Sequence, residues 1–138
     1  MNEYKFENLK LGQEESFSYI VTEDKVALFK ELTGDNYPLH NDKGFAVSHG
    51  LKDRVVYGMI TASLLSTLAG VYLPGKFCII QEVSAKFYRP VFIDDTLNVQ
   101  GVVDELNDTV RQCIIRVNIT NQDNVKVLKG KLTVGFTE

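Results

Sequence analysis

The chain has 138 residues, of which 44% are hydrophobic and 24% are charged, and its formal net charge is -3. This length fits a single domain, and the composition allows a packed core and excludes a disordered chain. Binding to nucleic acid is not expected, because it requires clustered Lys and Arg side chains and the sequence contains no such cluster.

The sequence shows no feature that would direct it to a membrane or out of the cell. The first ten residues are polar and no apolar run follows them, so no secretion signal is expected. Residues 57–73 form the longest apolar-rich stretch, but Ser and Thr interrupt it, so we expect no membrane span. Cys78 and Cys113 lack metal-binding or disulfide spacing and are expected in the core. We therefore expect a cytoplasmic protein without a bound metal.

The first part of the chain predicts a strand followed by a helix. Apolar residues alternate with others over residues 15–21, which is typical of a strand. Thr22 can then cap a helix whose first turn is acidic, and Gly34 is suited to end that helix. We expect residues 35–42 to be irregular, because Pro38 has no amide N–H and restricts the residue before it.

A short helical turn over residues 42–47 and a loop over residues 50–54 are expected next. Gly58 then opens the most apolar segment of the chain, residues 59–73, which Pro74 ends. A helix that is apolar on nearly every side belongs inside the protein, and small residues let other backbone approach it closely. The small residues are Thr61, Ala62, Ser63, Ser66, Ala69 and Gly70.

The rest of the chain predicts a sheet. Four segments rich in Val, Ile and aromatic residues are separated by short turns, which favours consecutive antiparallel strands. These segments are residues 77–88, 96–105, 110–121 and 125–136. One long helix buried by one curved sheet is an α+β arrangement, and we expect a single domain over residues 1–138. Such a sheet leaves an edge strand that needs cover, so we predict a homodimer.

Asp35 and His40 are the first candidates for chemistry. A loop bent by Pro38 can turn both side chains toward one point, where a carboxylate and an imidazole sharing a water form a general acid–base pair. The alternative is that Asp35 only caps the following turn and His40 packs against it. The other histidine, His49, lies beside Ser and Gly and is expected in an exposed loop.

Gly58 is the second candidate. It begins the apolar helix, where free N–H groups and the positive end of the helix dipole can bind an oxyanion or a polarised thioester carbonyl. The alternative is a glycine that is needed only for close packing.

Four ordered motifs resemble the MaoC-like, (R)-specific enoyl-CoA hydratases. The segment Phe29–Asp42, FKELTGDNYPLHND, is similar to the hydratase motif of an Asp, then Asn-Pro-Ile/Leu-His, then a second Asp. Val55–Met59, VVYGM, resembles the Val-Val-His-Gly-Met that begins the family's central helix. Leu73–Gly75 resembles the family's Leu-Pro-Gly, and Phe87–Val91 with Asp95 resembles its Phe-x-x-Pro-Val and Gly-Asp-Thr.

The resemblance implies a hot-dog fold, in which an antiparallel sheet wraps around a long apolar helix, usually in a dimer. It implies reversible addition of water to a trans-2-enoyl thioester, giving the (R)-3-hydroxyacyl thioester. By this analogy Asp35 and His40 activate the water, the Gly58 N–H polarises the thioester carbonyl, and Ser66 faces the pocket as a supporting residue. No cofactor is implied beyond coenzyme A or phosphopantetheine as part of the substrate.

Two departures from the family pattern are visible. Tyr37 replaces the Asn before the proline, with an Asn shifted to Asn36, and Tyr57 replaces the His before Gly-Met. Asn often orients loop backbone, so Asn36 or Tyr37 is expected to substitute. Together the departures suggest a different acyl substrate.

The sequence leaves open the carrier of the acyl group, and it allows two functions other than the hydratase. The carrier can be coenzyme A or an acyl carrier protein, and the basic candidates for contacting it are Lys43, Lys52, Arg54 and Lys86. A hot-dog thioesterase is a second possible function, although residues 59–73 contain none of the acidic residues that such enzymes usually place there. A non-catalytic acyl-thioester binder is a third, and it would not need Asp35 and His40 to converge.

Overall fold

Five antiparallel strands form one sheet in this computed structural model, which describes all 138 residues. The strands are β1 (Glu14–Ile20), β2 (Cys78–Phe87), β3 (Thr96–Asn107), β4 (Gln112–Thr120) and β5 (Lys126–Phe136). Their order in the sheet is β1-β3-β4-β5-β2, so β1 and β2 are the two edges. The consecutive strands β3, β4 and β5 pair as hairpins, whereas β2 pairs only with β5.

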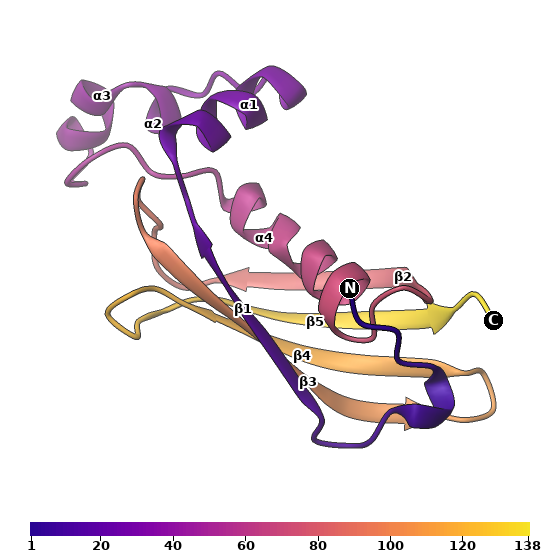
Figure 1. Ribbon diagram of the computed structural model, residues 1–138. Helices are drawn as coiled ribbons and strands as arrows, with labels where there is room; N and C mark the ends of the chain where they lie inside the picture. Colours follow the sequence, from indigo (N-terminus) through magenta and orange to yellow (C-terminus); the bar gives the residue numbers. More distant parts are fainter.

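The helices lie on one side of this sheet and beyond its end. They are α1 (Glu23–Thr33), α2 (Pro38–Asn41), α3 (Lys43–Ser48) and α4 (Gly58–Thr67). Figure 1 shows α4 lying along the concave face of the sheet, with α1, α2 and α3 grouped beyond its N-terminal end. A short 3-10 turn, Phe6–Asn8, precedes β1. No helix is long and apolar enough to cross a membrane.

Close contact between α4 and the sheet builds the core. Leu64, Leu65 and Leu68 of this helical segment are almost fully buried. Glycines in the strands let the helix come near, because a Cβ added to Gly101 would lie 2.6 Å from a methyl carbon of Leu68. At Gly130 an added Cβ would lie 2.8 Å from Leu65. The predicted α+β arrangement of one helix on one sheet is confirmed.

Local signals in the sequence placed most element boundaries correctly. The Thr22 hydroxyl accepts a hydrogen bond from the Lys25 N–H at 3.4 Å, and Gly34 ends α1 with a φ of 72°. Cys113 is fully buried and Cys78 is partly buried, as expected for core residues.

Two helical details differ from the predictions. Residues 38–41 form the short helix α2 where an irregular loop was expected, because Pro38 occupies the first helical turn, in which its missing N–H costs no hydrogen bond. The α-helical part of α4 ends at Thr67, and a π-helical turn, Leu68–Tyr72, follows, closed by a bond from the Leu73 N–H to the Leu68 carbonyl.

The helix side of the edge strand β2, called the β2 margin below, is left uncovered by the rest of the chain. Val83 and Phe87 point to the helix side of the edge strand β2, yet 49% and 50% of their surfaces are exposed. The helix α4 also carries exposed residues at helical spacing, namely Met59, Ser63, Ser66 and Thr67, and Met59 lines a hollow together with Phe87. The expectation that α4 is buried nearly all round is therefore wrong for the isolated chain.

Candidate active site

Two adjoining hollows lie where the start of α4 meets the segment that follows α1. His40, Gly58 and Phe87 line both hollows, which have volumes of about 290 and 260 Å³. The first hollow is also lined by Asp35, so Asp35, His40 and the start of α4 border the same cavity. The second has mostly apolar walls, made by Val55, Val56, Thr61, Tyr88, Arg89, Pro90, Val91 and Val127.

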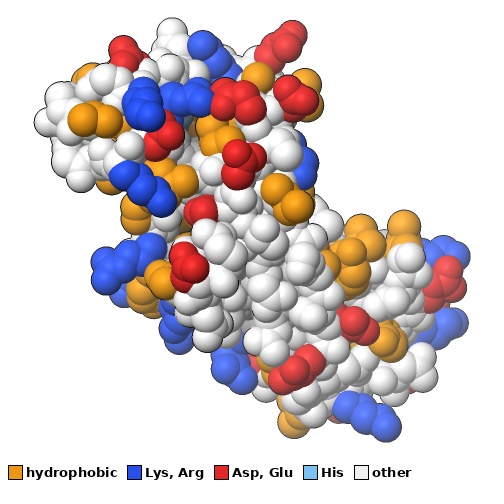
Figure 2. Space-filling model, turned by 60° about the vertical axis from the view of Figure 1, so that its left-hand side comes forward, with side chains coloured by type: hydrophobic (Ala, Val, Ile, Leu, Met, Phe, Trp, Pro, Cys, Tyr) orange, Lys and Arg blue, Asp and Glu red, His pale blue; other side chains and the backbone are white.

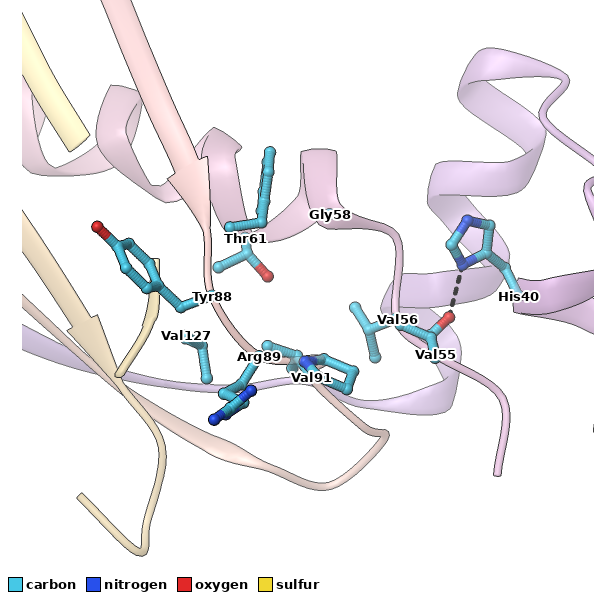
Figure 3. Close-up of a pocket in the computed structure, with 11 residues that line it drawn as sticks. His40, Val55, Val56, Gly58, Thr61, Tyr88, Arg89, Val91 and Val127 are labelled. Carbon is cyan, nitrogen blue, oxygen red and sulfur yellow. Dashed lines mark hydrogen bonds between the residues drawn. The ribbon is translucent and has the colours of Figure 1, made fainter. Parts of the chain in front are cut away.

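A backbone contact fixes the state of His40. Its Nδ1 lies 2.6 Å from the carbonyl oxygen of Val55, as Figure 3 shows. A carbonyl can only accept, so Nδ1 carries the hydrogen, and in the neutral ring Nε2 keeps a free lone pair. The ring also packs against Tyr57, with centroids 4.2 Å apart. His40 is therefore oriented to accept a proton at Nε2.

The backbone around Asp35 is held by short-range contacts. One carboxylate oxygen of Asp35 accepts a hydrogen bond from the Tyr37 N–H at 3.1 Å, and the Asp35 N–H donates to the Thr33 hydroxyl at 3.2 Å. The carboxylate has no other hydrogen-bond partner in the protein. Asp35 thus caps the following turn, as the alternative interpretation expected, and still lines the hollow with His40.

Tyr57 connects this loop to the start of α4. Its side chain is 2% exposed, and its hydroxyl donates to the carbonyl of Asp35. The same hydroxyl accepts a hydrogen bond from the Asn41 amide at 3.1 Å, and that amide also donates to the Tyr37 carbonyl at 2.9 Å. Tyr57, which stands where the family pattern has His, therefore acts as a support for the loop that carries Asp35.

Asn41 was missed by the sequence analysis. The role of orienting the loop backbone, expected of Asn36 or Tyr37, belongs to Asn41, because Asn36 is exposed and its side chain makes no hydrogen bond. The cause is local geometry: the short helix α2 turns Asn41 back toward the Tyr37 carbonyl. Tyr37 itself is half exposed and packs edge-on against His40, with centroids 5.7 Å apart.

The amide of Gly58 is open to a ligand. It is the first residue of α4, where N–H groups have no partner within the helix. A Cβ added at this position would lie 3.1 Å from the ring of Phe87, so glycine keeps the space beside the helix start free. The helix dipole makes this position favourable for negative charge.

Two other candidates lie away from the hollows. Ser66 is exposed and lines neither hollow in the single chain, so its supporting role stays a prediction. It follows Gly58 by eight residues, which places it roughly 80° around the helix and about 12 Å along it. His49 is exposed, and its Nδ1 lies 2.8 Å from the carbonyl of Phe45. No cluster of His, Cys, Asp and Glu could hold a metal ion.

A carboxylate, an oriented imidazole and a free amide at a helix start can together activate a water and stabilise an oxyanion. Comparison with known proteins gives this site a context, since the sequence profile of the MaoC like domain matches residues 6–127. The chain belongs to the MaoC-like domain family. 

Two curated MaoC-like relatives match along nearly the whole chain. An (R)-specific enoyl-CoA hydratase of Rhodospirillum rubrum is 33% identical over 94% of this chain and 89% of its own length. A 3-hydroxybutyryl-CoA dehydratase of Methylorubrum extorquens is 32% identical over 94% of this chain and 82% of its own length. The solved (R)-hydratase of Aeromonas caviae, at 32% identity, covers 93% of this chain and 97% of its own chain with a TM-score of 0.88. The fold is therefore the hot-dog fold.

Proposed function

We propose that this MaoC-like protein is a hydro-lyase that reversibly hydrates trans-2-enoyl thioesters to (R)-3-hydroxyacyl thioesters. The observation that carries the proposal is the single hollow that Asp35, the oriented His40 and Gly58 all line. The activities named for the two curated relatives support the same reaction class.

In this mechanism a water lies between the Asp35 carboxylate and Nε2 of His40. These groups take a proton from the water as its oxygen attacks C3, and the pair returns a proton to C2. Negative charge that develops on the thioester oxygen is stabilised by the Gly58 N–H at the positive end of α4. Dehydration follows the same steps in reverse.

The acyl chain is proposed to enter the hollow of about 260 Å³, whose walls are formed by Val56, Val91 and Val127 among others. Coenzyme A is the proposed carrier, because both curated relatives are named for CoA substrates. That no cofactor takes part beyond this carrier stays a prediction, as does the cytoplasmic location.

The four basic candidates for contacting the carrier differ in availability. Lys43 and Arg54 form ion pairs with Asp53 and Glu23, at 3.9 and 2.6 Å. Lys52 lies over the ring of Phe92 at 4.3 Å. Lys86 makes no ion pair and lies 5.3 Å from the ring centre of Tyr88, a residue of the hollow. We therefore assign the carrier contact to Lys86. Lys43 and Arg54 are held in ion pairs, and Lys52 contacts Phe92, which lines neither hollow.

The uncovered β2 margin supports a homodimer. An edge strand presents unpaired backbone groups, and β2 also carries the half-exposed Val83 and Phe87. A second copy related by a two-fold axis would pair β2 with β2 and cover these side chains together with Met59 of α4, which lines a hollow with Phe87. We propose this interface as the dimer contact.

Hydration of crotonyl-CoA, followed by the loss of enoyl absorbance, tests the reaction. We expect activity in the parent protein and a loss of about 100-fold or more in Asp35→Asn and in His40→Ala, because each removes a member of the acid–base pair. His49→Ala is the matched control, since that histidine lies outside both hollows, and it should keep the parent rate.

The same assay separates the alternative functions. Release of free CoA thiol without hydration would favour the thioesterase, and binding without either reaction would favour the non-catalytic binder. A parent protein that is inactive on short-chain and medium-chain enoyl thioesters would contradict the proposed reaction. Unchanged rates in either variant would contradict only the assigned role of that residue.

A further inference from the structure

Thr61 is polar, buried and without a partner. Its side chain is 2% exposed, and its hydroxyl is the one buried side-chain polar atom in the chain that makes no hydrogen bond. A helical Thr often bonds to the carbonyl four residues before it, here Tyr57, but this bond is not made. Leaving a buried hydroxyl unpaired costs about 1–3 kcal/mol, so this group calls for an explanation.

The position of Thr61 relates it to the reaction. It follows Gly58 by three residues, which places both on one face of α4, about 4.5 Å apart along the axis. Both line the hollow of about 260 Å³ that is assigned to the acyl group, and His40 lines it too. Figure 3 shows the Thr61 hydroxyl turned from α4 into the space in front of Val56 and Val91.

The walls around this hydroxyl offer it no polar partner. Val56, Val91 and Val127 are apolar, and the structure gives Thr61 no bond to Arg89 or to any other polar group of the hollow. The amide of Gly58 is an unpaired donor on the same helix face and needs an acceptor, and the Thr61 hydroxyl can donate to the same acceptor. A bound molecule with an oxygen beside the helix start would satisfy both.

We propose that Thr61 donates a second hydrogen bond to the thioester oxygen, beside the bond from the Gly58 N–H. The inference rests on the proposed hydratase function and adds a catalytic residue to it. As water adds to C3, negative charge moves to the thioester oxygen and strengthens both bonds, while the Thr61 proton stays on Thr61. The unpaired hydroxyl of the free protein is then a donor held ready for the transition state.

Thr61→Val tests the proposal, because valine keeps the branched shape and removes only the hydroxyl, and Thr61→Ser is the control that keeps a hydroxyl. For crotonyl-CoA hydration we expect kcat of Thr61→Val to fall about 100-fold while KM changes less than about threefold. Thr61→Ser should keep kcat within about tenfold of the parent. The melting temperature of Thr61→Val should be equal to or higher than that of the parent, since an unpaired buried polar group is removed.

Opposite changes in kcat and stability distinguish this role from a structural one. A Thr61→Val protein with parent kcat would overturn the proposal, and so would a loss of kcat that is accompanied by a lower melting temperature. A direct readout is the carbonyl stretching frequency of crotonyl-CoA bound to Asp35→Asn, in which turnover is blocked. Adding Thr61→Val should raise this frequency, and an unchanged frequency would contradict the bond. If the parent shows no hydration at all, the proposed function fails and this inference fails with it.

Discussion

At the residue scale, Tyr57 contacts three other residues of the site. Its hydroxyl holds the Asp35 carbonyl and the Asn41 amide, and its ring packs against His40. We therefore expect the site to be sensitive to loss of the Tyr57 hydroxyl, although this hydroxyl contacts neither the Asp35 carboxylate nor Nε2 of His40.

We expect Tyr57→Phe to lower kcat about tenfold and the free energy of unfolding by about 1 kcal/mol, because the Asp35 carbonyl loses its partner and the loop is less well held. Tyr72→Phe is the matched control. The Tyr72 hydroxyl makes no hydrogen bond, and its ring stacks on Phe17 at 4.6 Å, away from the site. Steady-state kinetics and urea unfolding measure both effects, and equal behaviour of the two variants would show that the Tyr57 bonds do not matter.

At the scale of elements, the contact between α4 and β5 sets how closely the helix can approach the sheet. At Gly130 an added Cβ would meet Leu65 at 2.8 Å and the backbone oxygen of Ser84 at 3.0 Å, and backbone cannot swing aside as a side chain can. At Gly70 an added Cβ would meet nothing within 4 Å.

We therefore expect Gly130→Ala to lower the free energy of unfolding by about 1–3 kcal/mol through overpacking. Gly70→Ala is the control and should change it by less than about 0.5 kcal/mol. Urea unfolding of the two variants tests this, and a neutral Gly130→Ala would mean that the sheet can move away from α4 at little cost.

Sequence patterns predicted these elements well where one local rule decides. Alternating apolar residues located the strands, and Thr22 and Gly34 located the two ends of α1. The same rules failed at Pro38, because proline can either interrupt a helix or begin one, and the tertiary contacts of α2 decide between them.

The candidate site was predictable in part for the same reason. The loop carrying Asp35 and His40 and the start of α4 could be located from their order in the chain. The paths of individual side chains could not, because they depend on how α4 rotates against the sheet. Thr61 was therefore expected only as one of six small residues of the helix, and the side chain that holds the loop backbone was expected at Asn36 or Tyr37 and not at Asn41.

The proposed dimer is tested at the scale of the whole molecule. Figure 2 shows charged side chains of both signs mixed with hydrophobic ones over the surface of the helical part, so the proposed interface is argued from the edge strand β2 and not from this face. We expect a native mass of about twice 15.5 kDa by sedimentation. Val83→Glu places a charge in the proposed interface and should shift the protein toward the single-chain mass, because burying an unpaired carboxylate is costly.

Val110→Glu is the matched control for this variant. Val110 is 56% exposed in the turn after β3, far from β2 in the sheet order, so a charge there should leave the native mass unchanged. If the Val83→Glu protein keeps the dimer mass, the interface lies elsewhere on the chain. A single-chain mass for the parent protein would contradict the dimer.

Phe87 has a consequence for how the protein behaves on dilution. It is the last residue of the edge strand β2 and also a wall of both hollows. If a second copy holds β2 in place, the wall that faces substrate is firm only while the two chains stay together. The rate per enzyme molecule should then fall when the protein is diluted below its dissociation constant and recover when it is concentrated again. Each molecule's competence as a catalyst would thus depend on how much of the protein the cell contains.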